Sequence, residues 1–113
     1  MSGKVESACK LLDGIEAVKG EEEGKVTRSF LRKVFELLDE VDSKEEFIIS
    51  VGYIVARRKG GDLIKFFRAL RDCVEKEEGE WNKVREKLKD VLENTIKIYT
   101  IRAELREDLC TRR

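Results

Sequence analysis

The chain contains 113 residues, which is enough for one domain with a hydrophobic core of its own and argues against a second domain. Its 24 basic and 24 acidic residues cancel, so attraction to nucleic acid or membrane must come from local clusters of charge. The absence of histidine excludes His-based zinc sites and His-dependent nucleophiles, and the absence of proline removes the residue that breaks helices. We therefore expect an all-α protein without an active site.

A glutamate-rich linker separates the first two predicted helices. Apolar residues recur at helical spacing over Val5–Val18, and we expect this helix to end near Gly20. Residues 20–26 then form a solvated linker. The second helix should begin at Thr27 or one residue later, because a wide apolar stripe follows over Phe30–Val41.

Capping residues and glycines delimit the next two predicted helices. Ser43 and Glu46 predict a capping box, in which each side chain bonds to the backbone N–H of the other residue. The third helix ends in the cations Arg57–Lys59, which suit a carboxyl terminus, and Gly60–Gly61 are expected to stop it. Asp62 is expected to cap a fourth helix that is apolar on nearly two sides and therefore buried between neighbours. Its apolar residues are Leu63, Ile64, Phe66, Phe67, Leu70, Cys73 and Val74.

A long final helix is predicted after an acidic stretch that Gly79 interrupts. Apolar positions follow one another at steps of three and four over Trp81–Leu109, with Arg102 also falling on this line. A second apolar line begins at Leu92, which indicates the central helix of a bundle. The β-branched segment Thr95–Ile101 could form a strand, but helical spacing continues on both sides of it. The predicted fold is all-α: a single-domain bundle of about five helices, spanning residues 1–113, with a long C-terminal helix.

The three cysteines, Cys9, Cys73 and Cys110, form no CxxC pair, so neither a zinc ribbon nor a dithiol redox motif is predicted. An odd count in a chain with its own core fits a reducing cytosol, and each cysteine is expected to act as a small buried or half-buried hydrophobe. No stretch approaches the roughly 20 apolar residues needed to span a bilayer. We therefore expect a soluble, cytoplasmic protein that does not contact membranes.

The close acidic groups Glu21–Glu23, Glu45–Glu46 and Glu77–Glu78 are in expected linkers or at helix ends. Catalytic carboxylates need burial or a coupled partner to shift their pKa, and water solvates these groups instead. No glycine-rich phosphate loop followed by lysine and a hydroxyl residue is present. Gly60–Gly61 could open an anion site at a helix terminus, but the Asp62 carboxylate would occupy it. No catalytic residue, metal site or cofactor is predicted, and we do not expect an enzyme.

The balanced charge is distributed unevenly along the chain. The segment Glu36–Glu46 contains six acidic residues and one lysine, and the segment Asp72–Glu80 contains five acidic residues and one lysine. The segment Arg57–Arg71 contains six cations and one acidic residue, Asp62. The cations at positions 65, 68 and 71 should form one polar edge of a helix. If all six contact phosphates, the slope of log K against log salt is about −5. Alternatively, these cations pair with the acidic blocks of the same protein. The candidate RNA-binding residues are Arg57, Arg58, Lys59, Lys65, Arg68 and Arg71, together with Arg28 and Arg32 near the start of the second helix.

Four short motifs follow one another within residues 24–108. They are Thr27–Arg32, Glu46–Phe47, Tyr53–Arg58 and Asp62–Phe66. In order and spacing these motifs resemble the small α-helical subunit of type III (Csm-type) CRISPR effector complexes. The chain departs from that pattern in having Arg57 where the family has glycine, and in being less basic than many members.

This resemblance implies a non-enzymatic role in antiviral defence. Several copies would stack along a ribonucleoprotein and contact the backbones of the guide RNA and the target RNA, neighbouring copies and other effector subunits. By motif, Arg32 and Arg58 become the best phosphate contacts, and Thr27 and Ser29 orient the helix start. Two alternatives remain open: a protein-binding helical adaptor, and the small subunit of another CRISPR effector type.

Overall fold

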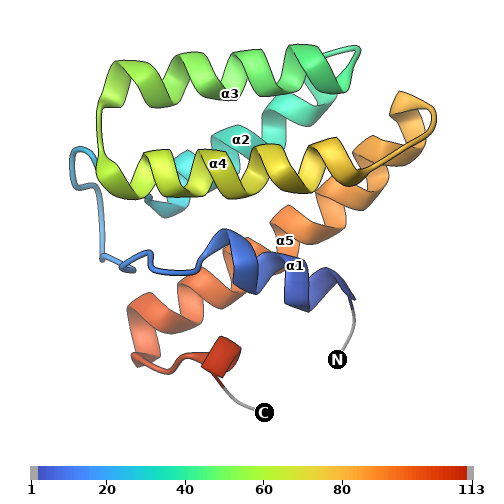
Figure 1. The fold of residues 1–113 in the computed structure, drawn as a ribbon. Coiled ribbons are helices and arrows are strands. Elements are labelled where there is room, and N and C mark those ends of the chain that lie inside the picture. The colour runs from blue at the N-terminus through green and yellow to red at the C-terminus, as the bar shows by residue number, and fades with distance from the viewer. Residues whose placement is uncertain (1–2, 112–113) are drawn as a thin grey trace.

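The computed structural model describes residues 3–111 and consists of α-helices, connecting loops and one 3-10 turn (Figure 1). The helices α1 to α5 cover Gly3–Leu11, Arg28–Glu40, Lys44–Arg58, Gly61–Lys76 and Trp81–Leu105, and the 3-10 turn η1 covers Leu109–Thr111. No strand occurs within this range. The predicted all-α fold with a long C-terminal helix is confirmed.

The molecule is flattened, with principal extents of 37 × 34 × 19 Å. Helices α3 and α4 form an antiparallel hairpin, and α5 packs mainly against α1 and α2 (Figure 1). The α2–α3 and α4–α5 turns are tied together, since Trp81 Nε1 donates to Val41 O at 3.0 Å and Lys44 Nζ donates to Glu77 O at 3.1 Å. The α3–α4 turn lies at the other end of the hairpin (Figure 1).

Helix α5 contributes both of its predicted apolar lines to the core. Leu92 and Tyr99 from the second line are fully buried, as is Leu88 from the first. The segment that could have been a strand is helical, and the buried Thr95 hydroxyl donates to Val91 O, 2.7 Å away in the preceding turn. This bond satisfies the only polar group that the Thr95 side chain carries into the core.

Helix α4 buries one side, not the two sides that its sequence predicts. Phe66 is fully buried and packs edge to face on Phe30, with ring centres 5.5 Å apart. Phe67 is only half-buried, and a Cβ atom on Gly52 of α3 would lie 3.2 Å from its ring. Ile64 is 42% exposed. The outer side of α4 is left uncovered because the neighbouring helices are on its other flanks.

Helix α1 is shorter than predicted, because it ends at Leu11 and not near Gly20. Gly14 adopts a positive φ of 71°, which a helix does not accommodate. The chain beyond it runs as an irregular segment to Thr27, so the predicted linker of residues 20–26 is only the second half of the real one. Apolar residues of this segment still reach the core, since Ile15 and Val26 are both buried.

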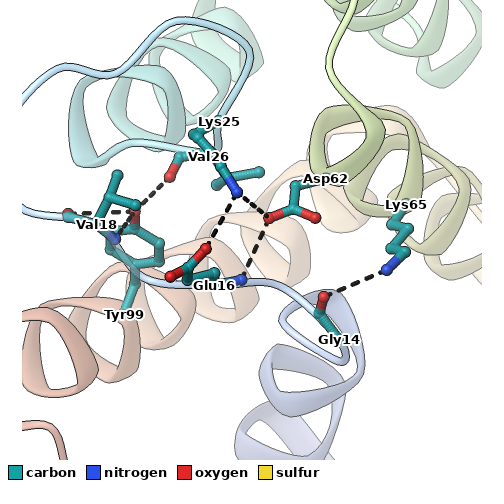
Figure 2. A network of polar contacts seen from close by, with 8 residues as sticks. All are labelled: Gly14, Glu16, Val18, Lys25, Val26, Asp62, Lys65 and Tyr99. Atoms are coloured by element: carbon teal, nitrogen blue, oxygen red, sulfur yellow. Dashed lines mark hydrogen bonds and ion pairs between the residues drawn. The ribbon is translucent and has the colours of Figure 1, made fainter.

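Polar contacts fasten this segment to the helices (Figure 2). The buried Tyr99 hydroxyl of α5 donates to Val26 O and accepts a hydrogen bond from Val18 N at 3.0 Å. Burial raises the pKa of Tyr99, which keeps the hydroxyl protonated as a donor. On the other side of the segment, Lys65 Nζ donates to Gly14 O at 3.5 Å.

Asp62 belongs to the same network and is not the N-cap that its position predicts (Figure 2). Gly60 is the N-cap of α4, and the Asp62 carboxylate accepts a hydrogen bond from Glu16 N at 3.3 Å. Lys25 lies between two carboxylates, 3.1 Å from Glu16 and 3.9 Å from Asp62. The hydrogen bond with Glu16 is the main cause of a raised pKa at Lys25. Asp62 is drawn away from its own helix because the linker offers it a backbone donor and a cation.

The other predicted helix starts are confirmed in large part. Thr27 caps α2, and its hydroxyl accepts from Phe30 N at 3.1 Å. Ser43 caps α3 and accepts from Glu46 N at 3.1 Å. The capping box is not reciprocal, because the Glu46 carboxylate accepts from Asp42 N at 3.4 Å and not from Ser43 N.

The end of α5 differs from the prediction. The helix stops at Leu105 because Arg106 adopts a left-handed conformation with φ of 55°, so Leu109 lies outside it. Arg102, which falls on the predicted apolar line, reaches Asp108 at 2.7 Å and also donates to Leu12 O at 3.0 Å. This half-buried arginine therefore ties the segment after α5 to the end of α1.

Two cysteines are not the free hydrophobes that the sequence predicts. Cys9 of α1 and Cys110 of η1 form a disulfide, with their Cα atoms 5.4 Å apart. Cys73 is free and half-buried, as expected, and burial raises the pKa of its thiol. The odd cysteine count gave no indication of a disulfide. The two paired residues are 101 positions apart in the sequence and meet only after folding. Because disulfides persist mainly in oxidising compartments, the cysteines no longer support the cytoplasmic prediction.

Among the described residues, no helix is both long enough and apolar enough to cross a membrane.

Candidate nucleic-acid interface

Three consecutive cations lie at the α3–α4 turn. Helix α3 ends at Arg58, and Lys59 adopts a left-handed conformation with φ of 52°, its N–H bonded to Val55 O at 3.1 Å. The predicted stop at the glycines is thus shifted by one residue, because Gly60 and Gly61 already belong to the start of α4. Arg57, Arg58 and Lys59 are all exposed. We refer to these three residues and the turn that carries them as the basic end.

Aromatic rings fix the positions of two of these guanidinium groups. The Arg57 guanidinium carbon lies 5.6 Å from the centre of the Tyr53 ring. The Arg58 guanidinium carbon lies 5.8 Å from the centre of the Phe30 ring, which belongs to the core. A cation at this distance from a ring gains roughly 0.5–1 kcal/mol at an exposed site. Both cations are held at the surface while their donor groups stay available to a ligand.

A hollow of about 360 Å³ opens at the basic end between α2 and α3. We refer to it as the basic hollow; it is lined by Lys33, Tyr53, Ile54, Arg57 and Arg58. Three of these residues are cations and none is acidic. The sequence prediction included the two arginines but missed Lys33 and Tyr53. Lys33 could not be found from sequence, because only the packing of α2 against α3 brings it to the arginines.

The other predicted pair, Arg28 and Arg32, lies apart from the basic hollow. They line a separate hollow of about 320 Å³ together with the acidic Glu21. Arg28 Nη1 is 3.0 Å from the Glu104 carboxylate, and this ion pair links α2 to the end of α5. Arg32 is exposed and forms no ion pair with a described residue. Arg32 is therefore the better placed of the two to bind a phosphate.

The three predicted cations of α4 do not form one edge. Lys65 faces the segment after α1, where it donates to Gly14 O (Figure 2). Arg71 lies over the Phe67 ring at 5.9 Å and 4.0 Å from the Asp72 carboxylate. Positions 65 and 71 are about 120° apart around a helix, so the two side chains diverge. Arg68, between them in the sequence, is exposed.

Of the alternative that the predicted cations pair with the acidic blocks of the chain, the described residues show one case, Arg71 with Asp72 at 4.0 Å. Within residues 3–111, only Arg28 and Arg71 of the eight lie within 4.0 Å of a carboxylate. Carboxylates of the acidic blocks pair instead with α5, as in Lys89–Asp39 at 2.7 Å and Lys87–Glu77 at 3.3 Å. The six cations without a carboxylate partner in this range are Arg32, Arg57, Arg58, Lys59, Lys65 and Arg68.

The acidic blocks lie at the end of the hairpin opposite to the basic end. Residues 36–46 surround the α2–α3 turn, and residues 72–80 surround the α4–α5 turn beside it. We refer to these two turns as the acidic end. Helix α3 separates the two ends and has 15 residues, which corresponds to about 22 Å. The acidic blocks and the basic end of the molecule are therefore at opposite ends of the hairpin.

In the described part of the chain, no group of three or more histidine, cysteine or acidic residues is positioned to hold a metal ion. No protein family, curated protein or solved structure matches this sequence or its fold. The basic end is therefore the feature of the molecule from which a function can be inferred.

Proposed function

We propose that this protein is a non-catalytic RNA-binding subunit that contacts RNA backbones through its basic end. The supporting observation is that Lys33, Arg57 and Arg58 line one hollow that contains no carboxylate. Phosphates carry the negative charge that such a hollow attracts, and arginine binds them through paired N–H groups. This matches the role that the resemblance implies: a small subunit of a type III CRISPR complex that contacts guide RNA and target RNA.

Binding of this kind reads charge and shape, not sequence. The cations of the basic hollow can neutralise phosphates whatever bases the RNA carries, which suits a subunit repeated along a guide of arbitrary sequence. Three phosphate contacts on a single strand give a slope of log K against log salt of about −2. Further contacts from Arg32, Lys59 and Arg68 would steepen this slope.

A charge-reversal experiment tests the proposal. The isolated protein should bind RNA weakly and without sequence preference, and should lose roughly tenfold or more in affinity between 50 and 200 mM salt. Arg58→Glu should abolish binding with little change in melting temperature, since an exposed contact of this kind contributes at most ~1 kcal/mol. Lys83→Glu is the matched control, because this exposed lysine lies beside the acidic end. Fluorescence anisotropy and thermal melts measure both quantities.

Three results would contradict this proposal. RNA binding that is insensitive to salt, or lost equally in both variants, would exclude recognition by the basic end. Unfolding of the Arg58→Glu variant would mean that this arginine serves the fold. RNA that copurifies from native cells, with its repeat-derived tag if present, would connect the protein directly to a guide.

Stacking of copies is the second part of the proposal. The acidic end of one copy and the basic end of the next carry opposite charge and lie at different ends of the hairpin. Their contact would be head-to-tail, and such a contact generates an open array, not a closed dimer. A small polar contact is weak in free solution and becomes effective when RNA holds neighbouring copies at high local concentration. Other effector subunits would meet the same two ends at the limits of the array.

We therefore expect a monomer in free solution at moderate salt and several copies in the intact particle. Light scattering of the free protein and subunit counting in the particle measure these two states. A tight symmetric dimer that resists high salt, or a single copy per particle, would contradict the stacking proposal.

A protein-binding adaptor is the second candidate function, and exposed apolar residues favour it. Ile49 on the outer side of α3 is 71% exposed. It borders an apolar hollow of about 330 Å³ that Ile48 and Val74 also line. If no RNA binds at low salt but a folded partner protein does, and Ile49→Glu removes that partner, this second candidate replaces the first.

A further inference from the structure

Tyr53 is an exposed aromatic residue that does not belong to the hydrophobic core. Its side chain is 64% exposed, whereas Phe30, Phe47, Phe66 and Tyr99 are fully buried. None of the side-chain hydrogen bonds within the described residues involves the Tyr53 hydroxyl. The ring of Tyr53 forms part of the wall of the basic hollow.

The surroundings of this ring are cationic. Arg57 lies one turn further along α3, with its guanidinium carbon 5.6 Å from the ring centre. Arg58 and Lys33 line the same hollow from α3 and α2. A ring with cations on its border offers two kinds of contact side by side: a flat apolar face and a set of N–H donors. A nucleotide has the matching parts, because its base stacks and its phosphate accepts hydrogen bonds.

An unpaired strand can use both contacts, but a duplex can use only one. Bases inside a duplex are stacked on each other and do not present a free face, so an aromatic side chain binds them only in single strands or loops. The hollow, at about 360 Å³, lies at the lower end of the range for small-ligand sites, which suits a single nucleotide. Apart from the Tyr53 hydroxyl, its lining offers only lysine and arginine as polar side chains, and no carboxylate or amide to read a base edge.

We infer that the basic hollow is a single-strand site, in which one unpaired base stacks on Tyr53 and an adjacent phosphate binds Lys33, Arg57 and Arg58. This inference rests on the proposed RNA-binding function and makes it more specific. Binding tolerates any base, because every base has a flat face. In an assembled particle the site would bind an RNA strand where its bases are unpaired. Where the strand pairs into a duplex, the base would leave the Tyr53 ring.

The test compares single-stranded and duplex RNA on three variants at 50 mM salt. A labelled 12-nucleotide RNA of mixed sequence is titrated by fluorescence anisotropy, alone and annealed to its complement. Tyr53→Leu keeps the apolar bulk but removes the flat ring, and should weaken single-strand binding roughly 5- to 150-fold. Tyr53→Phe keeps the ring and should retain the affinity of the unmodified protein. Ile49→Ala is the matched control, because Ile49 is similarly exposed, lies one turn earlier on α3 and does not line the hollow.

The result expected from a stacking site is a loss confined to single-stranded RNA in Tyr53→Leu, with duplex binding unchanged. If Tyr53→Leu binds single strands as the unmodified protein does, or if Ile49→Ala weakens them equally, the stacking site is wrong while RNA-backbone binding stands. If Tyr53→Leu weakens single strands and duplex alike, the ring acts by positioning Arg57 and the stacking site is also wrong. If the unmodified protein binds neither RNA, both the site and the proposed function fail.

Discussion

Reduction of the Cys9–Cys110 disulfide should lower the free energy of unfolding by about 4 kcal/mol. The crosslink joins residues 101 positions apart, so it encloses nearly the whole chain and restricts the unfolded state strongly. In the folded state it holds η1 against α1, beside the bond between Arg102 and Asp108. A domain of this size has a total stability of roughly 5–15 kcal/mol, so this loss is a large fraction of it.

Urea denaturation with and without reductant measures this loss. The double variant Cys9→Ser, Cys110→Ser should have the stability of the reduced protein and should not respond to reductant. Cys73→Ser is the matched control, since it should respond to reductant as the unmodified protein does. Burial raises the pKa of the Cys73 thiol and slows its reaction, so thiols are counted in denaturant.

The thiol count gives an independent check of the pairing. One thiol should be labelled before reduction and three afterwards, because only Cys73 is free. Three labels before reduction, or a urea midpoint that reductant leaves unchanged, would show that the two cysteines are not paired in solution.

Gly60→Ala should destabilise the protein by about 3 kcal/mol, at the upper end of the range for overpacking. The backbone of Gly60 lies directly on that of Gly24, and a Cβ atom at position 60 would overlap the Gly24 carbonyl group and lie 2.8 Å from Gly24 Cα. Its φ of −115° is open to any residue, so the constraint is the close approach of two chain segments and not backbone strain. Relief requires movement of the α3–α4 turn or of the linker.

Gly61→Ala is the matched control for this substitution. A Cβ atom at position 61 meets nothing within 4 Å, and the residue is the first of α4. Alanine restricts the unfolded chain there, so we expect unchanged or slightly increased stability, within about 1 kcal/mol. Thermal melts of the two variants decide the matter: equal melting temperatures would show that the Gly60–Gly24 contact does not constrain the fold.

The link between Gly60 and Gly24 also connects stability to the proposed function. Gly60 directly follows Arg57–Lys59, so a displaced turn would displace the basic end as well. Loss of RNA affinity in Gly60→Ala but not in Gly61→Ala would accompany the loss of stability. The position of the cations would then depend on the linker, although the linker does not contribute to the basic hollow.

The starts of α2 and α3 and the core of the long helix could be predicted from sequence because their causes are local. The hydroxyls of Thr27 and Ser43 bond to N–H groups three residues away, within reach of any chain that begins a helix there. The apolar spacing of α5 likewise places Leu92 and Tyr99 on one side of the helix before any partner is known. Helix type, order and approximate number follow from such short-range rules.

The end of α1 and the role of Asp62 could not be predicted, because competing long-range partners decided them. Apolar spacing continues past Gly14, but the buried Tyr99 hydroxyl holds the following segment in a non-helical course. Asp62 would be a good cap by its position, yet Glu16 N and Lys25 are brought to it by folding. Local preferences of a few tenths to about 1 kcal/mol yield readily to such contacts.

The sequence alone determined that the chain is helical, that its charge falls into blocks, and that Arg57–Lys59 end a helix. Only the tertiary structure decided which neighbours these cations have, because ion pairs and hollows depend on which helices lie side by side. Packing of α2 beside α3 adds Lys33 and Tyr53 to the arginines, while Arg28 is bound to Glu104 from α5. The same limit hid the disulfide, since the meeting of the chain's two ends is a property of the closed fold and leaves no trace in residue spacing.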